Sequence, residues 1–209
     1  MLWRTNPWKK IVSILSRIFR ASQSVASPAN IESQFTIKFY YIIYYMTVKV
    51  PIRYLPRQIT KRDKKRQSQM LLRSRKLYSQ QKYYTRKNIP SFHSKVSNHI
   101  IRARKIYGVP KITPNRALSK ATGCSIKAMS DIVKKGEGAY FSSGSRPNQT
   151  AQSWGFARLA SAITAGKSAA VDFAILDKGC NHRKRAYKYA LQSRKKHGRG
   201  LRRTQKTTL

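Results

Sequence analysis

The sequence predicts a mainly α-helical protein, with an α+β arrangement as the alternative. Three observations carry this prediction. Of the 209 residues, 45 are Lys or Arg and 6 are Asp or Glu, a formal net charge of +39. Hydrophobic residues make up 40%, below the roughly 45–50% of globular chains, which leaves room for one compact core. Between about residues 106 and 180 the charge thins and apolar residues recur at helical spacing. We therefore expect a small helical core flanked by extended basic arms.

The chain divides by composition into four segments. They are an N-terminal extension at 1–45, a basic arm with short helices at 46–105, the folded core at 106–180 and a basic C-terminal tail at 181–209. In the extension, Trp8–Arg20 is amphipathic and free of acids, a pattern typical of an organellar transit peptide or of a membrane-surface helix. The following run at 35–45 is rich in the residues that AT-rich DNA encodes and ends at Met46. This bias favours a third interpretation, a translated upstream region with Met46 as the start.

The basic arm is expected to begin extended and then form two helices. Pro51 and Pro56 oppose helix at its start. Apolar anchors are few in Lys61–Tyr78, predicted as the first helix, and Gly108 ends the second helix, predicted over Ser94–Tyr107. The C-terminal tail lacks a comparable apolar stripe, so it is expected to be disordered without a partner.

The core opens with a predicted helical hairpin. A helix over Pro114–Thr122 reaches Gly123, and Ser125 can cap a second helix, Ile126–Lys135, that ends at Gly136. This segment resembles the helix-turn-helix of DNA-binding repressors, whose second helix enters the major groove. The residues that the second helix would offer to bases are Ser125, Lys127, Ser130 and Asp131. A plain packing hairpin is the alternative.

A Gly- and Ser-rich stretch follows at 136–154 and predicts a phosphate contact. Its backbone N–H groups can form an anion-binding nest, with Ser143, Ser145 and Arg146 as polar partners. Thr150 can cap the next helix, predicted over 151–165. The alternative is a structural loop whose side chains bond their own backbone. Beyond it, Gly166 is predicted to cap the end of that helix, and 169–176 to be a strand or buried segment.

Cofactor and catalytic signals are weak, so no cofactor and no enzyme are predicted. The GKS at 166–168 has Ser161 where a P-loop needs glycine. Cys124 and Cys180 lie outside any CxxC and match neither standard zinc spacing nor a disulfide scaffold. A nuclease that uses the core acids is the enzymatic alternative; those acids are Asp131, Glu137, Asp172 and Asp177.

The charge points to a polyanion as the partner, because self-repulsion on this scale opposes compaction without counter-charge. The phosphate backbone of double-stranded DNA is the first expectation; RNA, capsid proteins and an anionic membrane are the others. The residues predicted to contact nucleic acid are Lys61, Arg62, Lys64, Lys65, Arg66, Arg73, Arg75, Lys76, Tyr78, Lys82, Tyr83, Tyr84, Arg86, Lys87, Lys127, Ser143, Ser145, Arg146, Arg183, Lys184, Arg185, Arg194, Lys195 and Lys196. Three of them are tyrosines that can stack on bases or pack on sugars.

Three stretches carry a resemblance to a known family. They are VKVPIRYLPRQITKRDKKRQ at 48–67, KLYSQQKYYTRK at 76–87 and the long run from TGCSIKAMSDIVKKG to AGKSAAVD at 122–172. From Met46 to about residue 180 the chain resembles an uncharacterised basic domain family of large double-stranded DNA viruses of algae, the chlorella viruses and their relatives. The resemblance implies a viral origin and a place in the particle, and it supplies no catalytic residue.

Together these observations predict a virion structural protein that neutralises packaged nucleic acid and links it to the inner capsid. It would lie in the virion interior or on the capsid inner surface, and in the host nucleus or cytoplasm during assembly. One alternative is a minor capsid protein whose arms contact other capsid subunits. The other is a ribosomal or other RNA-binding protein.

Overall fold

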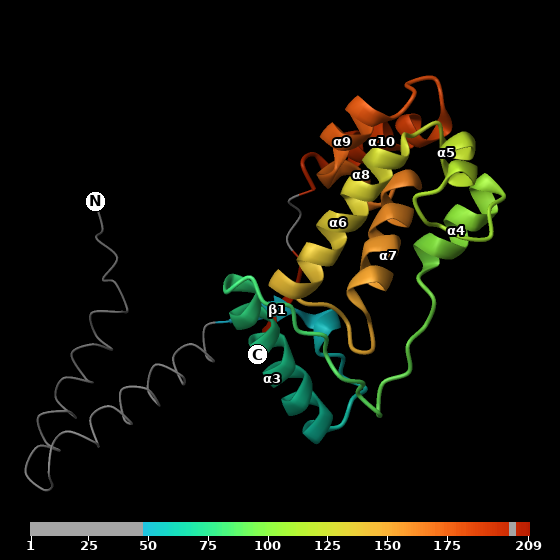
Figure 1. Ribbon diagram of the computed structural model, residues 1–209. Coiled ribbons are helices and arrows are strands. Elements are labelled where there is room, and N and C mark those ends of the chain that lie inside the picture. The colour runs from blue at the N-terminus through green and yellow to red at the C-terminus, as the bar shows by residue number, and fades with distance from the viewer. Residues whose placement is uncertain (1–47, 201–203) are drawn as a thin grey trace, which may run out of the picture. The chain divides into compact units, whose positions relative to one another are not determined.

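The computed structural model describes residues 48–200 and 204–209. The expectations for the extension at 1–45 lie outside these residues. The chain from Lys49 to Leu209 forms one compact unit, so the predicted arm and tail belong to the same unit as the core. In order, its elements are β1 (Lys49–Pro51), the 3₁₀ helix η1 (Ile52–Tyr54), α3 (Lys61–Ser79), α4 (Asn98–Tyr107), α5 (Arg116–Thr122), α6 (Ile126–Ser142), α7 (Ala151–Ile163), α8 (Lys167–Val171), α9 (Phe173–Gly179), α10 (Arg185–His197) and β2 (Lys206–Thr208) (Figure 1). The fold is mainly α, which confirms the predicted class.

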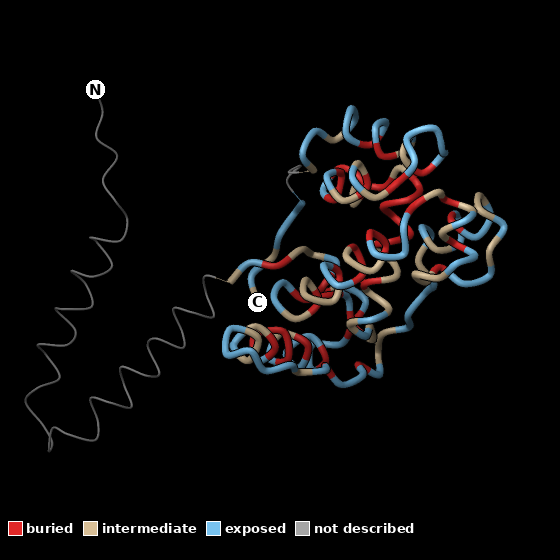
Figure 2. The backbone as a smooth tube through the Cα atoms, turned by 45° about the horizontal axis from the view of Figure 1, so that its top comes forward, coloured by how far each residue is buried: buried red, intermediate tan, exposed pale blue. Residues whose placement is uncertain are grey.

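Helix α6 is the central element of the unit. It packs along α7, and it also contacts α3 near its C-terminal end and α9 near its N-terminal end. The main core lies between α6, α7 and the shorter helices α4, α5, α8, α9 and α10, and it includes Leu118, Met129, Ile132, Leu159 and Ile163, each 0% exposed. In Figure 2 buried and exposed residues alternate along the helices. Contacts with several neighbouring helices therefore fix the position of α6.

The second helix of the predicted hairpin is longer than expected, because α6 passes through Gly136 and ends at Ser142. A Cβ added at Gly136 would lie 2.6 Å from the Cα of Gly155 on α7. The glycine is therefore required for close approach of two helices and does not end one. Gly123, in contrast, has φ +74° and does end α5, as predicted.

The start of the predicted basic arm and the end of the tail pair with each other. β1 and β2 form a two-stranded antiparallel sheet in which Val50 faces Thr207. Val50, Tyr54 and Leu55 are buried together with Leu71 of α3. The interpretation of an unattached arm is therefore wrong for residues 49–105, and the predicted core boundary at 106 does not divide the fold.

The segment from α7 to α10 is mainly helical. The segment at 169–176, predicted as a strand or buried segment, lies in α8 and α9. Gly166 precedes α8 as its N-cap, whereas α7 already ends at Ile163. The tail predicted to be disordered forms α10, which packs its small residues Ala186, Ala190 and Ser193 inward. Small side chains let α10 lie close to α8, and local hydrophobicity does not reveal this contact.

Cys124 and Cys180 form a disulfide between residues 56 positions apart. The backbone supports the connection: Ser125 N–H donates to the Gly179 carbonyl at 2.7 Å, and Asn181 N–H donates to the Gly123 carbonyl at 2.8 Å. The start of α6 is thus covalently joined to the end of α9. The sequence analysis did not pair these cysteines, because only the tertiary fold brings them together. Within the described ranges, no helix is both long and apolar enough to cross a bilayer.

Candidate nucleic-acid interface

Helix α3 carries a basic stripe on its outer side. Its buried residues recur at helical spacing and include Asp63, Gln67, Met70, Leu71 and Ser74. The opposite positions are basic and exposed, and we call them the α3 surface: Arg62, Lys65, Arg66, Arg73 and Lys76. Because residues three or four apart share one face of a helix, these cations form a continuous row.

The helix reaches this orientation by capping and by polar contacts. The Thr60 hydroxyl accepts a hydrogen bond from the Asp63 N–H at 3.2 Å, which caps the N-terminus. On the inner side, the Gln67 amide donates to the carbonyls of Tyr54 and Ser145 at 3.3 and 3.4 Å. These contacts fix the side of α3 that carries Gln67 against the rest of the fold. The basic row lies on the other side of the helix and therefore faces solvent.

Two predicted contacts, Arg86 and Ser145, are corrected by the structure, which buries both of them. The Arg86 guanidinium donates to the Ser74 hydroxyl at 3.1 Å, the Tyr140 carbonyl at 3.1 Å and the Ser145 hydroxyl at 2.7 Å. It also lies 3.7 Å from the centre of the Tyr140 ring. Burial lowers the pKa of Arg86 from its usual value. Arg86 thus holds the segment after α3 against α6, and neither residue is available to a phosphate.

Contacts within the loop at 143–150 favour the structural-loop alternative over the predicted anion nest. The N–H groups of Ser143 and Gly144 both donate to the Ala139 carbonyl, at 2.9 and 3.1 Å, and so close the end of α6. The Asn148 side chain holds the 89–92 segment by bonds to Ile89 and Phe92. Thr150 and Ser153 satisfy the start of α7 through a capping box, which confirms the predicted cap. Ser143 and Arg146 remain exposed at the surface of this loop.

A second group of predicted cations lies where the disulfide joins α6 to α9. We call it the disulfide corner: Lys127, Arg183, Lys184 and Arg185, all exposed. The Lys184 stem lies over the turn that precedes α6, since a Cβ on Gly123 would be 2.6 Å from Lys184 Cγ. In Figure 1 α6 runs from this corner to α3. Helix α6, with 17 residues, is about 25 Å long, and the disulfide corner lies at its N-terminal end while α3 contacts its C-terminal end.

The helix-turn-helix resemblance holds for the local hairpin alone. Ser125 caps α6 as predicted, accepting from the Ala128 N–H at 3.2 Å. However, α3, α7 and α9 all pack against α6, and Ser125 N–H is bonded to Gly179. The packing confirms that the hairpin is part of the core. Ser125 and Lys127 stay exposed and Ser130 and Asp131 half-buried, so groove reading by this helix remains a prediction.

The remaining predicted residues are distributed over three elements. Those that are exposed are Lys61, Lys64, Lys82, Tyr83, Lys87, Arg194, Lys195 and Lys196. Arg75 is half-buried, and its guanidinium donates to the Ser143 carbonyl at 2.9 Å. Arg194 lies over the Phe173 ring at 4.3 Å. The tyrosines Tyr78 and Tyr84 are half-buried.

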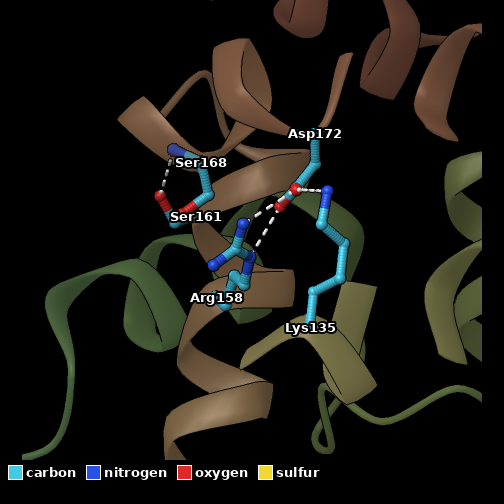
Figure 3. Close-up of polar contacts among 5 residues, drawn as sticks. All are labelled: Lys135, Arg158, Ser161, Ser168 and Asp172. Atoms are coloured by element: carbon cyan, nitrogen blue, oxygen red, sulfur yellow. Dashed lines mark hydrogen bonds and ion pairs between the residues drawn. The ribbon is translucent and has the colours of Figure 1, made fainter. Parts of the chain in front are cut away.

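Two of the four core acids proposed for a nuclease, Asp172 and Asp177, are engaged within the fold. The Asp172 side chain is fully buried, and its carboxylate accepts from Arg158 Nε at 2.7 Å and Arg158 Nη2 at 2.8 Å, with Lys135 Nζ at 3.0 Å (Figure 3). Asp177 accepts from the Tyr187 hydroxyl at 2.9 Å. Among the residues that the structure describes, no three His, Cys, Asp or Glu side chains gather to hold a metal ion. Asp172 instead ties α6 and α7 to the α8–α9 junction.

One surface residue was missed by the sequence analysis. Phe141 lies at the end of α6 and contacts the rings of Tyr78 and Tyr83. The predicted stop at Gly136 hid it, because the residues beyond were interpreted as a loop. Helix-forming residues such as Ala139 and the aromatic pair after it were the available signal.

The geometry defines a basic, mainly helical protein whose cations are carried on folded elements. A family model matches residues 51–183, from the last residue of β1 to the turn before α10. The chain therefore belongs to the family of unknown function DUF5824. Searches of curated proteins and of solved structures gave no match.

Proposed function

We propose that this protein is a virion structural protein that binds and neutralises packaged nucleic acid, with double-stranded DNA as its main partner. One observation carries the proposal: 45 basic residues face 6 acids, so at least 39 positive charges need counter-charge from outside the chain. One of those acids, Asp172, is itself taken up inside the fold. The α3 surface and the disulfide corner present part of this excess to solvent. The viral setting rests on the family resemblance of the sequence.

The mechanism is release of counterions. Duplex DNA carries one negative charge per roughly 1.7 Å of its axis and a condensed layer of cations. Each Lys or Arg that meets a phosphate releases part of this layer, which favours binding through entropy. Because the two basic surfaces lie near opposite ends of α6, one protein offers cations to phosphates at two separate places. Binding of this kind depends on charge and geometry and is nearly independent of base sequence.

The packing of the α3 region argues against the alternative of a minor capsid protein with extended arms. A minor capsid protein that threads extended arms between subunits needs those arms to be free. Residues 49–105 are instead packed on the rest of the unit, and α10 takes up 13 residues of the predicted tail. This packing favours nucleic acid over arm-mediated capsid contact.

The test measures DNA affinity of the full chain across a salt series. We expect the logarithm of the binding constant to fall linearly with the logarithm of salt concentration, by about 0.9 per phosphate contact. The triple variant Arg62→Gln, Arg66→Gln and Arg73→Gln should reduce the slope by about 3. A matched triple on α4, Arg102→Gln, Arg104→Gln and Lys105→Gln, removes the same charge from exposed positions outside the proposed surfaces and should change the slope less.

Two results would overturn the proposal. A slope near zero would exclude charge neutralisation. Equal slope changes in the two triple variants would exclude the α3 surface as the binding face. A parallel series with RNA of the same length separates the RNA-binding alternative, which requires tighter binding to RNA than to DNA at every salt concentration.

A further inference from the structure

Tyr83 presents an aromatic ring to solvent in a way that the fold imposes. The residue is 72% exposed, more than any other large hydrophobic residue that the structure describes. Exposed aromatic rings are enriched where a protein contacts a partner. The question is which partner chemistry suits this ring.

The turn after α3 aims Tyr83 back toward α6. Gln81 N–H donates to the Tyr78 carbonyl at 3.0 Å, and Lys82 N–H donates to the Leu77 carbonyl at 2.9 Å. These two bonds form a helix-terminating turn in which Gln81 adopts φ +59°. This left-handed conformation normally selects glycine. The chain thus accepts an unfavourable backbone at the position that brings Tyr83 onto the end of α6.

Three rings hold one another in a fixed arrangement, which we call the Tyr83 platform: Tyr78, Tyr83 and Phe141. Phe141 stacks on Tyr78 with ring centres 6.0 Å apart and planes 12° apart. Tyr83 meets Phe141 edge-on at 5.0 Å. Tyr78 and Phe141 are half-buried, so they act as the support and leave the Tyr83 ring facing outward. The support removes much of the rotational freedom that a lone surface tyrosine would lose on binding.

The neighbourhood of the platform is basic. Lys82 is adjacent in sequence, and Lys76 lies on the last turn of α3; both are exposed. The nearest acid on α6, Glu137, lies one turn before Phe141 but turns toward α7, since its Cγ would be 3.3 Å from a Cβ on Gly155. A flat ring beside cations suits a ligand that combines a π face with a phosphate.

The third tyrosine of this region does not share these features. The Arg73 guanidinium already covers the Tyr84 ring at 4.8 Å. Tyr84 also packs on the apolar cluster of Ile59, Met70 and Ile89. Of the tyrosines predicted to stack on bases, Tyr83 therefore has the ring that is open to a base.

We infer that the Tyr83 platform is a stacking site for an unpaired base, with Lys76 and Lys82 on the adjoining phosphates. The ligand class is single-stranded nucleic acid, at ends, gaps or loops, because the faces of paired bases are covered by their neighbours in a duplex. The inference rests on the proposed function, in which basic surfaces bind the phosphate backbone. It adds that the protein distinguishes unpaired from paired strands at one site.

The test compares a short oligo(dT) with a duplex that has the same number of phosphates, using the full chain and fluorescence anisotropy. Tyr83→Ala should weaken oligo(dT) binding about 5- to 100-fold and duplex binding less than about twofold. Tyr83→Phe should keep the affinity, because it keeps the ring, and Tyr83→Leu should not, because it keeps the apolar area alone. Ile101→Ala, at another exposed apolar residue (53% exposed), should leave both affinities unchanged.

The outcomes separate this inference from the proposed function. If the wild-type chain binds duplex with a steep salt slope but oligo(dT) binding ignores Tyr83, the stacking site alone is overturned. If the wild-type chain binds neither ligand, the proposed function fails and the inference falls with it. Full rescue by Tyr83→Leu would overturn base stacking in favour of general apolar contact. Tyr83-dependent binding to phosphatidylserine vesicles without oligo(dT) binding would overturn it in favour of a membrane surface.

Discussion

Helix α6 makes two contacts of different chemistry, one with α7 and one with the α3 region. Toward α7 the backbones approach at Gly136 and Gly155, and apolar side chains fill the remaining space. Toward α3 the contact depends on the Arg86 guanidinium, the Tyr140 ring and the Ser74 hydroxyl. We call these the glycine contact and the arginine contact.

The difference follows from the composition of the partner helices. Helix α7 has no acids and one basic residue, Arg158, so it can bury a broad apolar face. Helix α3 has eight basic residues among 19 and few apolar ones, so its inner side must bury polar groups. Buried polar groups are stable when they are hydrogen-bonded. The arginine contact thus attaches a highly basic helix without burying its outward cations, which the proposed function requires.

Removal of the disulfide should have the largest effect on stability. It fastens the end of α6 that lies away from the arginine contact. Closing a loop of 56 residues lowers the entropy of the unfolded chain by an amount worth about 4 kcal/mol. The double variant Cys124→Ala and Cys180→Ala should lose most of this free energy of unfolding, measured by urea denaturation. Reductant should shift the wild type similarly and leave the double variant unchanged; an insensitive wild type would contradict the prediction.

Arg86→Ala should break the arginine contact and cost about 3 kcal/mol. The change removes three hydrogen bonds and the ring contact, and leaves buried acceptors unpaired. Arg86→Lys should not restore stability, because a single ammonium cannot reach the same acceptors. Hydrogen exchange should show earlier opening of α3 than of α7. A loss of unfolding free energy below about 0.5 kcal/mol, the range of surface substitutions, would contradict a structural role for Arg86.

Gly136→Ala should break the glycine contact and cost about 1 to 2 kcal/mol. The new methyl would meet the Gly155 Cα at 2.6 Å, and this overpacking outweighs the gain of about 1 kcal/mol in helix propensity. Gly138→Ala is the matched control on the same helix, since its Cβ meets the Tyr78 hydroxyl, a side-chain end and not a backbone atom, at 3.3 Å. The control should be neutral or slightly stabilising in thermal denaturation. Equal losses of stability in Gly136→Ala and Gly138→Ala would contradict the close approach of α6 and α7 at Gly136.

Asp63 should give a small pH dependence confined to the α3 end. The Ser91 hydroxyl and N–H donate to its carboxylate, at 2.5 and 3.1 Å, and these bonds lower its pKa below the usual value. A lowered folded pKa stabilises the protein above the ordinary carboxyl pKa of about 3.9, and this stabilisation is lost as the pH falls through the folded pKa. The difference in unfolding free energy between wild type and Asp63→Asn should therefore shrink as the pH falls from 6 to 3, as measured by urea denaturation. A difference that stays constant over this range would contradict the prediction.

Local features of the sequence predicted much of the helical content. The caps at Ser125 and Thr150 and the helix ends at Gly108 and Gly123 were all identified correctly. These features depend on residues within one or two turns of each other, so sequence spacing is sufficient to find them. The exposure of most predicted cations also follows from sequence, because charged side chains are rarely buried without a partner.

Only the tertiary structure decided which residues have such a partner. Arg86 lies in a run of basic residues, and nothing nearby in sequence indicates that Ser74, Tyr140 and Ser145 surround it. The passage of α6 through Gly136, the helix in the C-terminal tail and the disulfide have the same origin. Each depends on contacts between residues far apart in the chain. The sequence by itself determined how much charge the protein carries and where helices begin; long-range packing decided which side chains are buried and which remain free to meet a ligand.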